Sequence, residues 1–97
     1  MNKYPIKVGS VVISKMGHDA GRSYITCEEV DGDFVLVVDG KHRGMENPKK
    51  KRRKHLKTTG IFVPALAEKI AQGLPIENHE LRSWLKKGES EACQNPM

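Results

Sequence analysis

The chain has 97 residues, which suits one small domain, and its hydrophobic content of 37% allows only a small core. Its net charge of +5 is unevenly placed: residues 41–57 carry nine Lys and Arg against one acid, residues 1–40 carry four against six, and residues 58–97 carry four against five. A near-neutral body with one concentrated basic segment is typical of a protein that binds a polyanion.

The cysteines and histidines indicate neither a disulfide framework nor a metal site. Cys27 and Cys93 lie far apart, and no histidine pairs with a cysteine or carboxylate at ligand spacing. The sequence also lacks a nucleophile–base arrangement, a phosphate-binding glycine loop and a paired-carboxylate motif, so we expect no enzyme activity, cofactor or metal. With no apolar signal region at its start and no run of about 18 apolar residues, the chain is expected to be a cytoplasmic protein with reduced thiols, monomeric when free and away from membranes.

The first 60 residues have the composition of short strands separated by turns. Between the first two strands, residues 16–22 predict a loop in which Gly17 and Gly21 supply left-handed backbone positions. Asp31-Gly32 and Asp39-Gly40 are hairpin turn signals. Five short strands over about 50 residues favour a mainly β fold, a small closed barrel over residues 5–60, rather than a two-sheet sandwich. The predicted strands are residues 8–15, 23–28, 34–38, 41–45 and 55–59.

Residues 61–97 change to helical spacing and predict a C-terminal extension with two short helices. The first helix carries apolar residues from Val63 onward and stops at Gly73. The second covers residues 78–88, with Asn78 as its cap and Gly88 after its last turn. Residues 89–97 have little to bury and are expected to fray. The apolar face of the second helix consists of Leu81, Trp84 and Leu85.

Six consecutive cations follow Pro48 within the basic segment: Lys49, Lys50, Lys51, Arg52, Arg53 and Lys54. Unpaired charge is too costly to bury, so this basic run is expected on the surface, as a disordered loop between the fourth and fifth strands. Three interpretations are open, namely contact with nucleic-acid phosphates, a solvated loop without a ligand, and a nuclear import signal, whose composition Pro48–Lys54 matches. The local concentration of charge favours nucleic acid, with RNA preferred over DNA on the motif described next.

Residues 11–37 resemble the KOW motif, a hydrophobic strand, a loop ending in a fixed glycine and two further hydrophobic strands. Gly21 falls at the eleventh position, where the motif has its defining glycine, and Arg22 follows as the usual basic residue. With residues 35–40 and the basic run leading to Thr59, the pattern is similar to the archaeal and eukaryotic-type family of large-subunit ribosomal protein fourteen and its small bacterial relatives. The resemblance covers residues 6–60. It implies an SH3-like barrel that binds RNA, commonly in ribosomes or transcription–translation factors, and that meets RNA at the loop after the first strand.

The predicted function is non-catalytic binding of structured RNA, with ribosomal RNA as the expected ligand and ribosomal or transcription–translation proteins as expected neighbours. The chain has five aromatic residues, too few for stacking many single-stranded bases, so recognition through phosphates and shape is expected. The alternative function is a protein-interaction module of the same machinery, docking a partner through Leu81 and Trp84. The predicted RNA-binding residues are Lys15, His18, Arg22, Lys41, His42, Arg43, Lys49, Lys50, Lys51, Arg52, Arg53, Lys54 and Lys57, with Gly17 and Gly21 as structural glycines of the loop.

Overall fold

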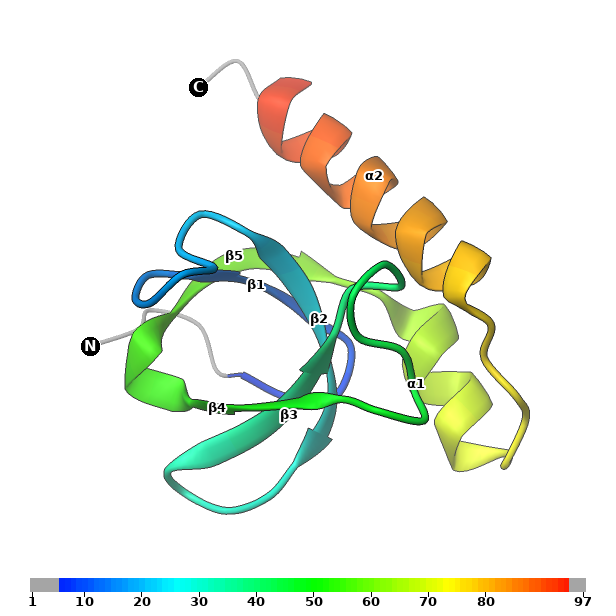
Figure 1. Ribbon diagram of the computed structural model, residues 1–97. Coiled ribbons are helices and arrows are strands. Elements are labelled where there is room, and N and C mark those ends of the chain that lie inside the picture. Colours follow the sequence, from blue (N-terminus) through cyan, green and yellow to red (C-terminus); the bar gives the residue numbers. More distant parts are fainter. Residues whose placement is uncertain (1–5, 95–97) are drawn as a thin grey trace.

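The computed structural model describes residues 6–94 of the chain, and the side chains of residues 6–87. It consists of a five-stranded antiparallel sheet and two α-helices (Figure 1), so the predicted mainly β fold with a helical C-terminal part is confirmed at this level. The elements are β1 (Ser10–Ser14), β2 (Ser23–Glu29), β3 (Phe34–Val38), β4 (Lys49–Arg52), the 3-10 helix η1 (Arg53–His55), β5 (Leu56–Phe62), α1 (Pro64–Ala71) and α2 (Asn78–Gln94).

The sheet has the strand order β4-β3-β2-β1-β5, so β4 and β5 form its two edges. These edges are consecutive in the chain and are joined only by the three residues of η1. In a flat sheet, five strands would place the edges about 19 Å apart, whereas three residues of 3-10 helix rise only about 6 Å. The sheet therefore curls until its edges approach at η1 (Figure 1), although no backbone pairing joins β4 to β5 in the described residues.

Four of the five predicted strands lie where the sequence placed them, but the fourth does not. Residues 41–45 form turns, and the fourth strand is instead the basic stretch Lys49–Arg52. The reason is Asp39, whose carboxylate Oδ1 accepts the backbone N–H groups of residues 41, 42 and 43, each at 2.9 Å. These hydrogen bonds hold the chain in a turn just after β3. Strand pairing resumes only at Lys49, where the chain runs back alongside β3.

The core lies on both faces of the curled sheet. Inside the curl, alternate strand residues form a cluster with Val12, Tyr24 and Leu56 at its centre. On the outer face, residues of β1, β2 and β3 pack against Leu66 of α1 and Leu81 of α2, which are both fully buried. The helices therefore share a core with the sheet, and Leu81 is not available to dock a partner, contrary to the alternative interpretation of the sequence.

Both helices occur at the predicted positions, with corrections at their ends. After α1, Gly73 has a φ of 70° and the Leu74 N–H donates to the Lys69 carbonyl at 2.8 Å, as expected of a glycine stop. At the start of α2, the side chain of Glu80 accepts the Glu77 N–H at 3.0 Å, so Glu77 rather than Asn78 occupies the cap position.

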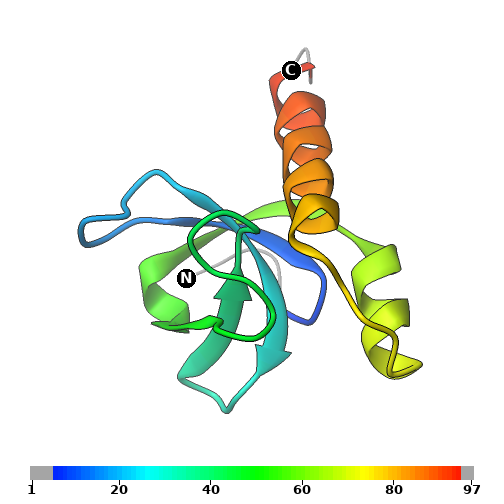
Figure 2. The ribbon, with the colours of Figure 1, turned by 45° about the vertical axis from the view of Figure 1, so that its right-hand side comes forward.

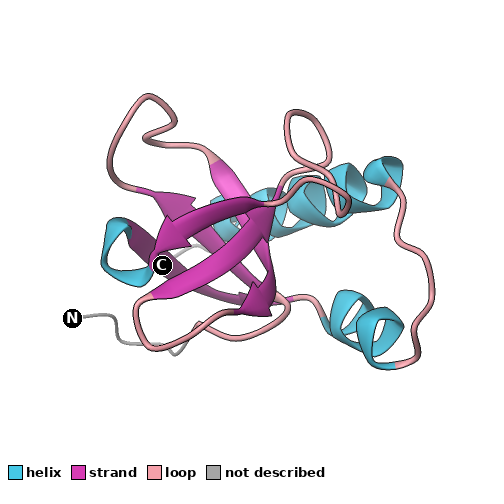
Figure 3. Cartoon of the chain, turned by 60° about the horizontal axis from the view of Figure 1, so that its bottom comes forward, coloured by secondary structure: helices cyan, strands magenta, loops and turns pink. Residues whose placement is uncertain are grey.

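The predicted end of the second helix at Gly88 is wrong, because α2 continues through this glycine to Gln94. Residues 95–97 of the tail that was expected to fray lie outside the described residues. Figure 2 shows the later turns of α2 projecting beyond the sheet, and Figure 3 shows both helices separated by an extended connection. No helix in residues 6–94 is long and apolar enough to cross a membrane.

The close approach of α2 to the sheet depends on Gly40. This residue has a φ of 77°, and a Cβ placed there would lie 2.5 Å from the Asn78 carbonyl oxygen and 2.9 Å from the Leu81 Cβ. Backbone at that distance cannot move aside without shifting the first turn of α2. The glycine of the predicted Asp39-Gly40 turn thus serves helix docking as well as turn geometry.

We predict that Gly40→Ala lowers the free energy of unfolding by about 2–4 kcal/mol, because the cost of placing alanine in a left-handed conformation and the cost of its clash with α2 add together. Gly73→Ala is the matched control, since Gly73 also has a positive φ but has no atom within 4 Å of its Cβ position. The control should lose only about 1 kcal/mol. Urea unfolding followed by fluorescence of Trp84, the single tryptophan, measures both. Equal losses in the two variants would contradict a steric role for Gly40 in docking.

Candidate nucleic-acid interface

The basic run is not a loop but an edge strand followed by one helical turn, so the prediction of a disordered loop is wrong. β4 pairs with β3 in antiparallel register, with Lys49 opposite Val37 and Lys51 opposite Val35. Residues directly opposite each other point to the same face of a sheet, and both valines are fully buried inside the curl. The alternation of a strand therefore sends every second cation inward.

Lys49 and Lys51 converge on one buried carboxylate. The Nζ of Lys49 lies 2.9 Å from Asp19 Oδ2, and the Nζ of Lys51 lies 3.3 Å from Asp19 Oδ1. Asp19 also accepts hydrogen bonds from the Tyr24 hydroxyl at 2.9 Å and the Ser14 hydroxyl at 3.0 Å. The side chains of Asp19 and Lys51 are only 5% and 10% exposed, so part of the run is buried, which the sequence did not predict.

This carboxylate stays ionised despite its burial. Desolvation alone would raise the pKa of Asp19, but hydrogen bonds from Lys49, Tyr24, Ser14 and Lys51 outweigh it and hold the pKa well below its usual value of 3.8. Burial of the Tyr24 ring and the hydrogen bond from its hydroxyl to Asp19 raise the pKa of Tyr24 to about 12. The group is therefore a permanent anion that neutralises charge from β4.

Arg53 is the third cation of the run held by the protein itself. Its guanidinium donates to the carbonyl oxygens of Asp31 at 2.9 Å and Ile6 at 3.0 Å, and it pairs with Glu29 at 3.1 Å. Arg53 thus connects η1 to the β2–β3 hairpin and to Ile6, which precedes β1. We name Lys49, Lys51 and Arg53 the anchored cations, because each forms an ion pair within the fold.

The other three members of the run, Lys50, Arg52 and Lys54, are exposed, and none makes an ion pair within the described residues. Lys50 and Arg52 lie over the ring of Phe34, with 4.6 Å and 4.9 Å to its centroid. Such cation–π contacts hold the stems of the side chains while the charged ends face water. We name this set the exposed cations.

The loop over residues 16–22 contains both predicted structural glycines, with φ values of 88° at Gly17 and 92° at Gly21. The N–H of Gly21 donates to the Ser14 carbonyl at 2.7 Å, so it closes the loop and is not free for a ligand. His18 and Arg22 of this loop are exposed. Asp19 faces inward from the same loop, and its ion pairs with β4 fix the loop against the edge of the sheet.

The structure brings Arg22 together with Lys41 and His42 of the β3–β4 connection. These residues line a groove of about 430 Å³ whose other wall is α2, which contributes Arg82 and Lys86. These two helical residues were not among those predicted from the sequence. Their spacing of four places them on one face of a helix, but only the docking of α2 shows which loops that face meets.

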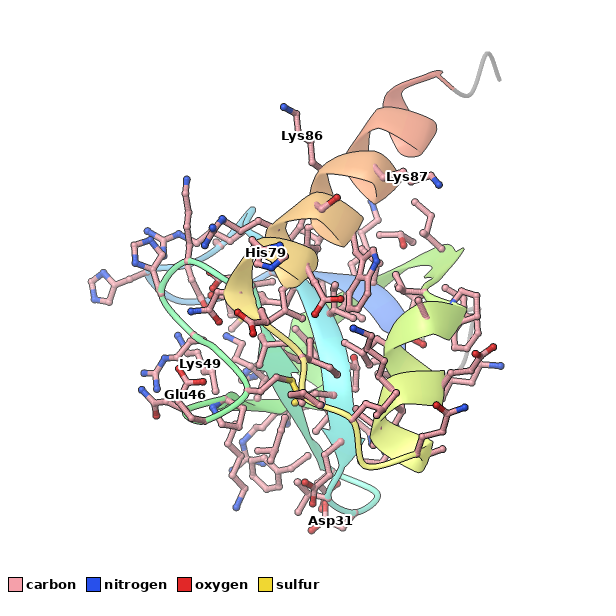
Figure 4. The ribbon with its side chains drawn as sticks, turned by 90° about the vertical axis from the view of Figure 1, so that its right-hand side faces the viewer. Asp31, Glu46, Lys49, His79, Lys86 and Lys87 are labelled. Atoms are coloured by element: carbon pink, nitrogen blue, oxygen red, sulfur yellow. The ribbon has the colours of Figure 1, made fainter. Side chains whose placement is uncertain are left out.

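The remaining predicted residues are more dispersed. Lys57 is exposed on β5, and Lys15 is exposed directly after the end of β1. Arg43 is half-buried, with a guanidinium nitrogen 3.3 Å from the Asn47 side-chain oxygen. Lys49, at 34% exposure, lies at the end of the loop that also carries Glu46 (Figure 4). In residues 6–87, no three His, Cys, Asp or Glu side chains gather as a metal site would require.

Comparison with known proteins leaves the resemblance to the KOW motif as a proposal: no family model matches the chain, and no curated protein sequence matches it significantly.

We predict that Asp19→Asn lowers the free energy of unfolding at neutral pH by about 2–4 kcal/mol, because it leaves two lysines without their anion partner. Asp33→Asn is a matched control, since Asp33 is an exposed aspartate in the β2–β3 hairpin without an ion pair in the described residues. The control should change stability by less than about 0.5 kcal/mol. Chemical denaturation of both variants measures the difference, and a decrease no larger than that of the control would refute the anchoring role.

The lowered pKa of Asp19 also predicts a pH dependence. Its ionisation contributes stability that is fully present above the pKa of this aspartate in the unfolded chain, about 3.8, and that is lost progressively as pH falls from there toward the lower pKa of the folded state. Between about pH 4 and pH 2, wild type should lose up to ~1.4 kcal/mol per pH unit through this group. Asp19→Asn should show a shallower decline in the same denaturation series. Parallel declines in the two proteins would argue that Asp19 does not carry this effect.

Proposed function

We propose that this chain is a non-catalytic RNA-binding protein of the KOW type, acting in association with the ribosome, and that its curled sheet is an SH3-like barrel. It contacts structured RNA through phosphates and shape rather than through base-specific stacking. The fold part of the proposal is supported by the single curled sheet whose edge strands meet at η1. The KOW part is supported by the positive φ of Gly21 and the exposure of Arg22 in the loop between β1 and β2.

The observation that carries the RNA proposal is the row of exposed cations, Lys50, Arg52 and Lys54, which lie on a paired strand and the helical turn after it without carboxylate partners in the described residues. Arg53 is already paired with Glu29, and Lys49 and Lys51 share the single carboxylate of Asp19. The protein thus supplies carboxylate partners for half of the run and leaves the other half for an external anion. A phosphate backbone is the polyanion that such a row fits.

The aromatic residues support recognition without base stacking. Tyr24 is buried at 2% exposure and donates to Asp19, and the ring of Phe34 is covered by two cations. Trp84 packs against the core, which leaves Phe62, at 41% exposure, as the most accessible ring in the described side chains. Single-stranded RNA readers need several exposed aromatic platforms, so structured RNA is the better match.

The import-signal interpretation fits this arrangement less well. A receptor that reads consecutive cations needs the run as an accessible extended segment, whereas β4 is paired along its length with β3. Reading all six side chains would require breaking the ion pairs of Lys49, Lys51 and Arg53. RNA contact uses only the side chains that already face solvent.

We predict that Lys50→Gln/Arg52→Gln weakens binding to a labelled RNA hairpin at every salt concentration. The slope of log affinity against log salt should fall by about 2, because two phosphates would no longer be neutralised by the protein. Fluorescence anisotropy from about 50 to 300 mM salt measures both quantities. The free energy of unfolding should fall by no more than about 1–2 kcal/mol, because neither side chain forms an ion pair in the described residues and only their exposed cation–π contacts with Phe34 are lost.

The matched control is Lys7→Gln/Lys87→Gln, which removes two charges beside another ring, that of Phe62. The control should keep the wild-type slope. Equal effects of the two double variants would mean that net charge alone drives binding, and absence of RNA binding by wild type would refute the function. Unlabelled duplex DNA at matched salt should compete more weakly than unlabelled RNA; stronger competition would favour a DNA ligand.

A further inference from the structure

We propose that the groove between α2 and the two loops that face it binds the phosphodiester backbone of RNA, so that the C-terminal helix forms part of the RNA interface. This inference rests on the proposed function and extends it to a second surface, separate from the exposed cations of β4 and η1. The sequence assigned the helices only to protein contact. Because one face of α2 lines the same groove as the two loops, we expect that face to contact the same RNA phosphates as the loops.

The charge of the groove favours an anion. Four permanent cations line it, Arg22 from the β1–β2 loop, Lys41 from the β3–β4 connection, and Arg82 and Lys86 from α2, together with His42. The one carboxylate among the lining residues is Asp39, and one of its oxygens already accepts three backbone N–H groups at 2.9 Å. Asp39 is thus engaged by its own turn, and the groove keeps an excess of positive charge.

Specific contacts within the fold hold the two walls of the groove in place. Arg82 donates from its guanidinium to the Gly40 carbonyl at 2.6 Å, which links α2 directly to the turn that carries Lys41. Leu81 and Leu85 seat the same helix on the sheet at 0% and 7% exposure. The tight contact at Gly40 sets the distance between the two walls. Cations from three separate segments are therefore held together in spite of their mutual repulsion.

The size and lining of the groove fit a polar chain better than an apolar ligand. Its volume of about 430 Å³ lies within the range of ligand sites, and all but two of its nine lining residues are polar or charged. A solvated helix face would spread its cations over a convex surface. A concave site with cations on both walls instead raises the local concentration of a phosphate chain.

Lys86 and Lys87 provide a test within the chain. They are adjacent and exposed, and they project to different sides of α2 (Figure 4). Lys86 is one of the residues that line the groove, whereas Lys87 lines a different pocket together with Phe62 and Trp84. Lys86→Glu and Lys87→Glu therefore change the same charge on the same helix. Arg82 is left unchanged, because its bond to Gly40 supports the fold.

The experiment measures affinity for the same labelled RNA hairpin as a function of salt. Lys86→Glu is expected to lower affinity by roughly tenfold and reduce the salt slope by about 1, whereas Lys87→Glu should stay within about twofold of wild type. Arg22→Gln, on the opposite wall, should act like a weaker form of Lys86→Glu, and Lys86→Arg should retain wild-type binding.

The outcomes separate the groove from the proposed function. Equal affinities of the Lys86 and Lys87 variants, with weakened binding in Lys50→Gln/Arg52→Gln, would overturn the groove while leaving RNA binding intact. If wild type binds no RNA, both proposals fall. Weakened binding in Lys86→Glu that Lys86→Arg does not rescue would show a steric effect rather than a phosphate contact, and would also overturn the groove.

Discussion

The buried carboxylate of Asp19 joins the first loop of the chain to the edge strand that carries its densest charge. Two lysines of β4, the hydroxyl of Tyr24 and that of Ser14 all point to it. Without this anion, Lys51 could not lie at 10% exposure beside the valines inside the curled sheet, because an unpaired buried ammonium is strongly unfavourable. The placement of β4, the position of the loop and the exposure of the alternate cations all depend on this contact.

The anchored side chains make β4 a strand, and the strand then determines what faces outward. Consecutive lysines in a disordered loop would repel one another and present no fixed spacing. Pairing with β3 separates neighbouring side chains to opposite faces, so Lys50 and Arg52 stand two residues apart over Phe34. Charged side chains on an edge strand also discourage pairing with other chains. The exposed cations therefore protect an edge and at the same time form the ordered row that we propose binds phosphates.

The docking of α2 adds a second cationic surface from residues far apart in the chain. Gly40 lets the helix approach the turn after β3, and the buried leucines of α2 hold it there. Arg82 and Lys86 then face Arg22 and Lys41 across one groove. Helix α2 shares the outer-face core cluster with the sheet, so a change at the helix–turn contact alters the geometry of the groove as well as stability.

Much of the local structure could be predicted from the sequence. Alternating β-branched residues indicated β1, β2 and β3, glycines at 17 and 21 indicated the left-handed loop, and apolar spacing indicated both helices. The fourth strand could not be found in this way, because six cations in a row have neither strand nor helix periodicity of their own. The end of α2 was also missed, since helix propensity treats Gly88 as a stop.

The sequence alone determined where charge is concentrated, where the glycine-containing turns after β1, β2 and β3 lie, and that a small core must suffice, because these follow from composition and local propensity. Only the tertiary structure decided which cations are free. The partner of Lys49 lies 30 residues earlier in the chain and that of Lys51 lies 32 residues earlier, and Arg82 meets a carbonyl 42 residues away. Ion pairing and groove formation depend on distances in space, and those are set by the curling of the sheet and the docking of α2.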